Sequence, residues 1–259
     1  MKRLICLAIG LAVLVIGGAL MMAPSVMGAP NYDPHKNVIV SSDEAKAKLQ
    51  RLLPPDRRDV KYQGTKDRPG IRVHVFSGDG VTAMVDVSDG HVASLSLPVP
   101  PPSGVTAVTS EDQAKRIAID YLSAVGSPVD GLSIEVRNST GAGTPGYTVI
   151  FTRTKGDIVL PDYRMVEVDA GTGQVFSFVD VRRPFQDPGT PKLSARDAAS
   201  AAVSQLGGGS AKTPQLIVSW DKAGHQKLVW LVPVSGSAGD PGIVVPIDAS
   251  SGDKVDLTQ

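Results

Sequence analysis

The amino-acid sequence predicts an α+β protein of tandem small units, each with one helix packed on a three- to four-stranded antiparallel sheet. An Asp is followed four residues later by a Gly at three places, Asp86 to Gly90, Asp169 to Gly173 and Asp248 to Gly252. Each copy stands between two strand-like runs, and a helix-start signal precedes each set of runs. Self-similarity at a spacing of roughly 80 residues indicates a repeated structural unit. We call the three copies the first, second and third repeats.

Each repeat is expected to begin with an amphipathic helix behind a capping box, in which a hydroxyl stands three residues ahead of a carboxylate. The three pairs are Ser41 with Glu44, Thr109 with Asp112, and Ser194 with Asp197. Behind Thr109, apolar residues recur at intervals of three and four, as on one face of a helix. These residues are Ala114, Ile117, Ala118, Tyr121, Leu122 and Val125. Helix-stop signals follow in all three repeats, at 54–55, 126–128 and 207–209.

After each helix the pattern changes to short runs rich in β-branched and aromatic residues, separated by Gly, Pro, Asn and Asp. Such runs predict strands at 60–63, 71–76, 81–87 and 91–97 in the first repeat, at 132–136, 147–152, 163–168 and 175–181 in the second, and at 216–220, 228–234, 243–247 and 255–257 in the third. About four antiparallel strands therefore follow each helix.

The repeated Asp is interpreted as a turn cap. An Asp at the end of a strand accepts hydrogen bonds from backbone N–H groups just ahead of it, and Gly supplies the positive φ that closes the turn. Asp169 and Asp248 are therefore predicted to be structural rather than ligands for calcium or substrate. The segment from Asp86 to Gly90 comes nearest to a calcium loop, but it lacks the distal Glu and equally fits a tight hairpin turn.

The N-terminus predicts export. Lys2 and Arg3 precede an uncharged run that ends at Met22, and small residues follow it. This is the pattern of a signal peptide, although the run approaches the ~20 residues that span a bilayer. Residues 1–29 are thus a signal peptide or an N-terminal membrane anchor, and both alternatives put the remainder outside the cytoplasm, secreted or held at the outer face of the membrane. The only cysteine, Cys6, lies in this segment.

The predicted domain organisation follows from the repeats and two Pro-rich stretches. The first, divergent repeat covers 38–97, the second 106–183 and the third 193–259, with linkers at 98–105 and 184–192. Without Lys2 and Arg3 the chain carries 24 basic against 26 acidic residues and no basic run. This near-neutral balance argues against binding to nucleic acid.

The closing hairpins carry a family resemblance. The segments 166–175 (VEVDAGTGQV) and 245–252 (VPIDASSG) resemble the final hairpin of PepSY domains, which are small extracytoplasmic modules. Residues 147–153 and 156–159 resemble the related YcdB/YcdC repeated domain of bacterial envelope proteins. The resemblance covers about 109–257, and the first repeat shares only its helix cap and the Asp86 to Gly90 element. It implies a helix against an antiparallel sheet, a role in binding or restraining envelope proteins, often hydrolases, and no catalytic residues.

No pattern in the sequence predicts chemistry. The four histidines, His35, His74, His91 and His225, are isolated and lack the spacing of a helical zinc site. His74 alternates with apolar residues and is expected on the solvated face of a strand. No Ser stands in a strand-to-helix elbow. We therefore predict no catalytic, cofactor-binding or metal-binding residues, no cofactor, and a protein that is not an enzyme.

Trp220 and Trp230 are expected in the core of the third repeat, with a binding groove as the alternative. The loops 138–146 and 235–242 are the expected places of contact with a partner, because recognition residues are common on loops of a rigid scaffold.

The predicted function is that of a non-catalytic, exported protein-binding module of the cell envelope, which inhibits, chaperones or positions a hydrolase. The expected partner is an envelope protein such as a peptidase or a cell-wall hydrolase, and the membrane is contacted only through the N-terminal segment if it stays uncleaved. One alternative is a small-ligand binder or enzyme with a site between repeats, which a pocket of convergent His, Asp and Arg side chains would favour. Another is a structural envelope component, which self-association without any partner would support.

Overall fold

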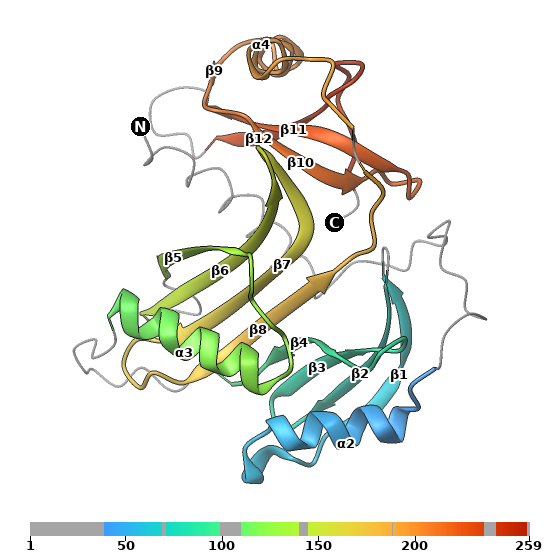
Figure 1. The fold of residues 1–259 in the computed structure, drawn as a ribbon, viewed down its shortest axis with the longest axis vertical. Helices are drawn as coiled ribbons and strands as arrows, with labels where there is room; N and C mark the ends of the chain where they lie inside the picture. Colours follow the sequence, from blue (N-terminus) through green and yellow to red (C-terminus); the bar gives the residue numbers. More distant parts are fainter. Residues whose placement is uncertain are drawn as a thin grey trace. The chain divides into compact units, whose positions relative to one another are not determined.

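The computed structural model describes residues 39–68, 71–98, 110–139, 145–187, 189–235 and 242–257. This part is α+β, with three α-helices, one short 3-10 helix and a mixed sheet of twelve strands (Figure 1). It falls into two compact units: an N-terminal unit of 39–153 and 162–183, and a C-terminal unit of 154–161 and 184–257. None of its helices is long and apolar enough to cross a membrane. The predicted signal or anchor segment, 1–29, lies outside the described residues.

The N-terminal unit begins with a helix and a four-stranded antiparallel ladder. Its elements are α2 (Ser42–Leu52), the 3-10 turn η1 (Pro55–Arg57), β1 (Lys61–Arg68), β2 (Ile71–Gly78), β3 (Val81–Asp86) and β4 (Val92–Ser96). Consecutive strands pair with one another, as short connections favour.

The chain continues with a second helix and four strands: α3 (Glu111–Ala124), β5 (Ser133–Ser139), β6 (Gly146–Lys155), β7 (Ile158–Asp169) and β8 (Val175–Arg182). Residues 154–161, which end β6 and begin β7, belong to the C-terminal unit, and the other residues of these elements belong to the N-terminal unit. Strand β4 pairs with β8 through Ser94 with Val179, Leu95 with Phe178 and Ser96 with Ser177. The first two predicted repeats therefore share one ladder within this unit (Figure 1).

Both helices bury one face in a common core. Ala45 and Leu49 of α2 and Ala114, Ala118 and Leu122 of α3 are almost completely buried, in the same cluster as Phe76, Phe151 and Phe178 of the strands. The spacing of three and four residues on α3 thus marks its buried face. Burial of each large apolar side chain stabilises the fold by about 1.5–3 kcal/mol.

One of the three predicted capping boxes is complete, one is present in part, and one is shifted. Ser41 and Glu44 form a complete capping box, and Ser194 accepts from the N–H of Asp197 at 3.2 Å. The cap of α3 is Ser110 with Gln113, whereas Thr109 with Asp112 was predicted; Thr109 lies outside the described residues. Gln113 Oε1 accepts from the N–H of Ser110 at 2.8 Å, a reach that its long side chain provides.

The C-terminal unit has the same order of helix and strands: α4 (Ala195–Gln205), β9 (Ser210–Ala211), β10 (Gln215–Trp220), β11 (Gln226–Ser235) and β12 (Ile243–Asp248). Ala198 and Ala202 of α4 pack against Val232 and Ile247. Strand β10 also pairs in parallel with Ile158 and Val159. The strand predicted at 255–257 is reduced to two isolated bridges on either side of Val255, Ile247 with Lys254 and Asp221 with Leu257.

The prediction that His74 faces solvent is wrong, since only 6% of the residue is exposed. Its Nε2 lies 2.8 Å from the carbonyl of Val40, and its Nδ1 lies 3.0 Å from the hydroxyl of Thr65. Because a carbonyl only accepts, Nε2 donates to Val40, and the Thr65 hydroxyl is the hydrogen-bond partner of Nδ1. Both ring nitrogens therefore have hydrogen-bond partners, so the imidazole can be buried at a strand position whose neighbours in the sequence are apolar.

Candidate functional site

The three Asp-to-Gly segments are built alike. In each, the Gly N–H donates to the Asp carbonyl at 2.8–2.9 Å, and the Asp N–H donates to the carbonyl of the residue after the Gly, also at 2.8–2.9 Å. The three glycines have φ between 69° and 84°, a region that favours Gly. The same closed turn therefore ends β3, β7 and β12.

The Asp side chains cap these turns, which confirms the prediction for Asp169 and Asp248. Asp169 Oδ1 accepts from the N–H groups of Gly171 and Thr172, and Asp248 Oδ1 accepts from those of Ser250 and Ser251. Asp86 does the same with the N–H and hydroxyl of Ser88. All three residues are buried. Their carboxylates are thus engaged in holding the backbone.

The calcium-like loop is also a turn. Potential ligand atoms of Asp86, Asp89 and His91 lie within 4.8 Å of one another. However, Asp86 binds Ser88, and the ammonium group of Lys48 donates to the Asp89 carbonyl at 3.1 Å, where it would repel a cation. We assign no metal to this group.

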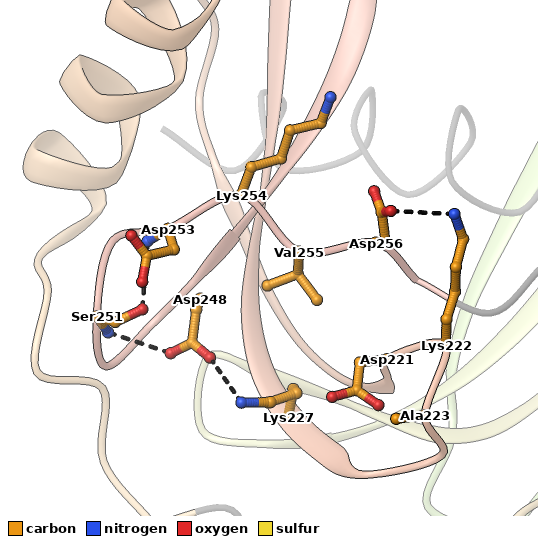
Figure 2. Close-up of a pocket in the computed structure, with 10 residues that line it drawn as sticks. All are labelled: Asp221, Lys222, Ala223, Lys227, Asp248, Ser251, Asp253, Lys254, Val255 and Asp256. Atoms are coloured by element: carbon orange, nitrogen blue, oxygen red, sulfur yellow. Dashed lines mark hydrogen bonds and ion pairs between the residues drawn. The ribbon is translucent and has the colours of Figure 1, made fainter.

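Two hollows in the described part border these turns. The first, of about 370 Å³, lies in the C-terminal unit beside the last turn (Figure 2). Lys227 reaches the Asp248 carboxylate at 3.2 Å, and Lys222 reaches that of Asp256 at 3.0 Å. Lys254 points away from the acidic side chains in this view. These two ion pairs thus neutralise much of the charge that lines this hollow.

The pKa values of the paired carboxylates in this hollow are lowered, as expected for ion pairs. Burial raises the pKa of Asp248, but hydrogen bonds from the N–H groups of Ser250 and Ser251 and from Lys227 outweigh it, and the pKa is lowered. The hydrogen bond from Lys222 lowers the pKa of Asp256. These carboxylates are therefore held ionised, as in structural ion pairs, and none is tuned for proton transfer near neutral pH.

The second hollow, which we call the His91 pocket, has a volume of about 530 Å³ and lies within the N-terminal unit beside the first turn. Its walls come from α2, the end of α3, the start of β4 and the end of β8. The polar side chains that line it are Lys48, Arg51, Asp89, His91 and Arg182. Three permanent cations and one histidine thus surround a single carboxylate.

That carboxylate is committed to the histidine. Asp89 Oδ1 accepts from the backbone N–H of His91 at 2.9 Å and lies 2.6 Å from His91 Nδ1. This side-chain hydrogen bond is the main cause that lowers the pKa of Asp89 to about 2, with a smaller contribution from the charge of Arg182. The other ring nitrogen, His91 Nε2, is buried and has no hydrogen-bond partner among the described residues. His91 therefore leaves one side of its ring unsatisfied.

A buried charge network holds Arg182 in place. Arg182 donates from Nε and Nη2 to the two oxygens of Asp180, at 3.0 and 2.5 Å. Asp180 also accepts from the hydroxyl of Ser127 at 2.7 Å and lies 3.2 Å from Arg164 Nε. Arg164 in turn contacts Asp162, which pairs with Arg153. Three guanidinium groups against two carboxylates leave one positive charge uncompensated in this network.

The sequence predicted no site residues, and the pocket residues are far apart in it. Arg182 is separated from His91 by the whole of the second repeat's helix and hairpins. A signal was nevertheless present. Asp180 and Arg182 continue the inward-facing alternation of Phe176 and Phe178, and charges at inward positions of a strand indicate a buried polar network.

The other residues singled out in the sequence lie elsewhere. Trp230 packs against the clusters of the C-terminal unit and donates from Nε1 to the Leu193 carbonyl at 3.1 Å, while Trp220 is half-buried at the end of β10. Of the two candidate contact loops, 140–144 and 236–241 lie outside the described residues.

Comparison with known proteins leaves the family open. No family model matches the chain, and no curated protein matches it in sequence. Among solved structures, the chain is similar to one described as the Bacillus megaterium YpeB C-terminal domain, with a TM-score of 0.47 and 14% sequence identity over 85% of this chain and 97% of that chain. The PepSY resemblance therefore stays a prediction.

Proposed function

We propose that the protein is a non-catalytic binding module of the cell envelope, exported by its N-terminal segment and organised as PepSY-like repeats. Its partner is an envelope protein such as a peptidase or a cell-wall hydrolase. It recognises an extended, acidic segment of that partner by adding it as a strand beside β1.

The exposed edge of β1 carries this proposal. In the described sheet β1 stands at one end of the strand order and pairs only with β2, over seven residue pairs. Most of its residues are exposed or half-buried, and Tyr62 is 44% exposed. An unpaired strand edge offers N–H and C=O groups to an extended peptide, and side chains beside it supply specificity.

The charged residues of β1 indicate which kind of partner segment would bind beside it. Lys61, Lys66 and Arg68 stand against the single acid Asp67. Positive charges on an edge oppose pairing with a second copy of the same edge, and they favour a partner with acidic residues. The bulge between Tyr62 and Gly64 twists the strand and limits indiscriminate pairing further.

Capture and titration test this proposal. The full chain is used as bait in an envelope extract, captured hydrolases are identified and assayed, and the strongest partner is purified and titrated. The double variant Lys61→Glu with Lys66→Glu is expected to weaken binding roughly tenfold, because two attractive charges become repulsive. The matched control is the double variant Lys192→Glu with Lys212→Glu, at two exposed positions in the C-terminal unit. Unchanged affinity in the edge variant, equal loss in the control, or self-association as the sole interaction contradicts the proposal.

A second candidate function is the binding of a small ligand. The convergence of His91, Asp89, Arg51 and Arg182 on one pocket is the arrangement expected of that alternative. The pocket takes its walls from the first and second predicted repeats, which share the N-terminal unit. A small ligand there and a partner strand at β1 are compatible, since the two sites share no residue.

A further inference from the structure

The His91 pocket has a positive charge that its own residues do not neutralise. Lys48 and Arg51 project from the second half of α2, and Arg182 ends β8. The one carboxylate on the wall, Asp89, is held by His91 through two hydrogen bonds. No hydrogen bond or ion pair to another described residue is found for the guanidinium of Arg51. Arg51 is exposed, so its five N–H donors are accessible to a ligand in this pocket.

Arg182 is preorganised to face the pocket. Its Nε and Nη2 are bound to Asp180, a side chain that is 1% exposed, and Nη2 also approaches the Gly126 carbonyl at 3.4 Å. Asp180 is itself fixed by Ser127 and by Arg164, whose side chain is 5% exposed. The remaining nitrogen, Nη1, makes no hydrogen bond to a described residue. Because one edge of this guanidinium is already fixed, binding of an anion at its other edge costs little further side-chain entropy.

His91 adds a second, independent observation. Its Nδ1 lies against the ionised carboxylate of Asp89, which can only accept, so Nδ1 carries a proton. Its buried Nε2 has no partner in the described part of the chain. Because buried polar atoms are normally hydrogen-bonded, this orphaned nitrogen in the pocket wall marks a place for a bound group.

We propose that the His91 pocket binds an oxyanion, a carboxylate or a phosphate group, held by Arg51 and Arg182 with Lys48 and His91 beside it. Planar guanidinium groups match the paired oxygens of both anions. The volume of about 530 Å³ admits a ligand larger than the anionic group itself, so the oxyanion is the anchor of a small molecule or of a side chain. This site is separate from the β1 edge, and either can fail without the other.

Titration of the full chain followed by amide NMR tests the proposal. Inorganic phosphate and glutarate are the two probes, and sodium chloride at the same ionic strength corrects for salt. We expect chemical-shift changes that saturate at the amides of Gly90, His91 and Gly126. The probe with the lower Kd shows whether the pocket prefers a phosphate or a carboxylate. Shifts that do not saturate with either probe, or that centre outside the pocket, overturn the proposal.

Variants at Arg51 sharpen the test. Arg51 is exposed on α2, so Arg51→Gln is expected to fold normally and to raise the Kd of the preferred probe roughly tenfold. Arg51→Lys keeps the charge and is expected to retain most of the affinity. The matched control is Arg196→Gln, at an exposed position of α4. Equal weakening by Arg51→Gln and Arg196→Gln would indicate general charge screening and would overturn the site.

Discussion

Arg182 and Asp180, two residues apart on the same face of β8, form a bidentate ion pair, and the Asp180 side chain is only 1% exposed. The pair links a surface pocket to the interior, because Asp180 also binds Ser127 and Arg164. Burial of charges is tolerated only when each is paired and hydrogen-bonded. The pair is thus both a support of the fold and the fixed wall of the His91 pocket.

Removal of that carboxylate is expected to be strongly destabilising. In Asp180→Ala, Arg164 and Arg182 lose their shared counter-ion, and the buried Arg164 is left undercompensated. We expect the free energy of unfolding to fall by about 3–5 kcal/mol. Urea unfolding of the variant and of Asp187→Ala, whose carboxylate is exposed in its pair with Lys155, measures the difference. A loss no larger than that of Asp187→Ala would show that the network does not stabilise the fold.

The turn cap at Asp169 makes a smaller contribution. Its Oδ1 accepts from two backbone N–H groups and from the Thr172 hydroxyl. Asp169→Ala removes a charged acceptor from the N–H groups of Gly171 and Thr172 and is expected to lower the free energy of unfolding by about 1–3 kcal/mol. Asp169→Asn keeps an acceptor oxygen and should lose less. Thermal unfolding of both, with Asp157→Ala in an exposed turn as the control, checks the order. Equal effects of Ala at 169 and 157 would argue against the cap.

Asp89 predicts a pH dependence of stability. The hydrogen bond from His91 lowers the pKa of Asp89 from 3.8 to about 2. A carboxyl whose pKa is lower in the folded than in the unfolded state stabilises the fold above its unfolded pKa, and this stabilisation is lost as pH falls through the folded pKa. The loss is therefore expected between about pH 4 and pH 2, and solvent screening of a side chain that is 55% exposed limits it to about 1 kcal/mol.

Comparison with Asp89→Asn isolates this effect. The variant removes the titrating group, so its stability should fall less steeply than that of the original chain over the same pH interval. Urea unfolding at several pH values gives the two slopes. Parallel slopes for the two proteins would refute the contribution of the pair.

Tyr121 predicts a stabilising substitution. Its ring packs edge-on against Phe178 with centroids 5.4 Å apart, and its buried hydroxyl has no hydrogen-bond partner among the described residues. Burial raises the pKa of this tyrosine well above its usual value. Tyr121→Phe keeps the ring contact and removes the unsatisfied hydroxyl, so a gain of about 1 kcal/mol is expected. A matching loss in thermal or urea unfolding would show that the hydroxyl has a partner after all.

Most of the elements could be predicted from the sequence because their signals are local. The strands predicted at 71–76, 81–87, 175–181 and 243–247 lie where β2, β3, β8 and β12 are observed, within one or two residues at their ends. Alternation along a strand and capping residues at a helix start depend on neighbours within a few positions. His74 shows the limit, since its burial depends on Val40 and Thr65, and the sequence around His74 does not place either residue beside it.

The sequence by itself determined the α+β class, the helix starts at Ser41 and Ser194, and the role of Asp169 and Asp248 as turn caps. Each of these depends on contacts between residues close in the chain. Only the tertiary structure decided that β4 pairs with β8 and that Arg182 stands beside Asp89 and His91. The choice of strand partner and the meeting of distant charges depend on packing over the whole unit, and no local pattern records them.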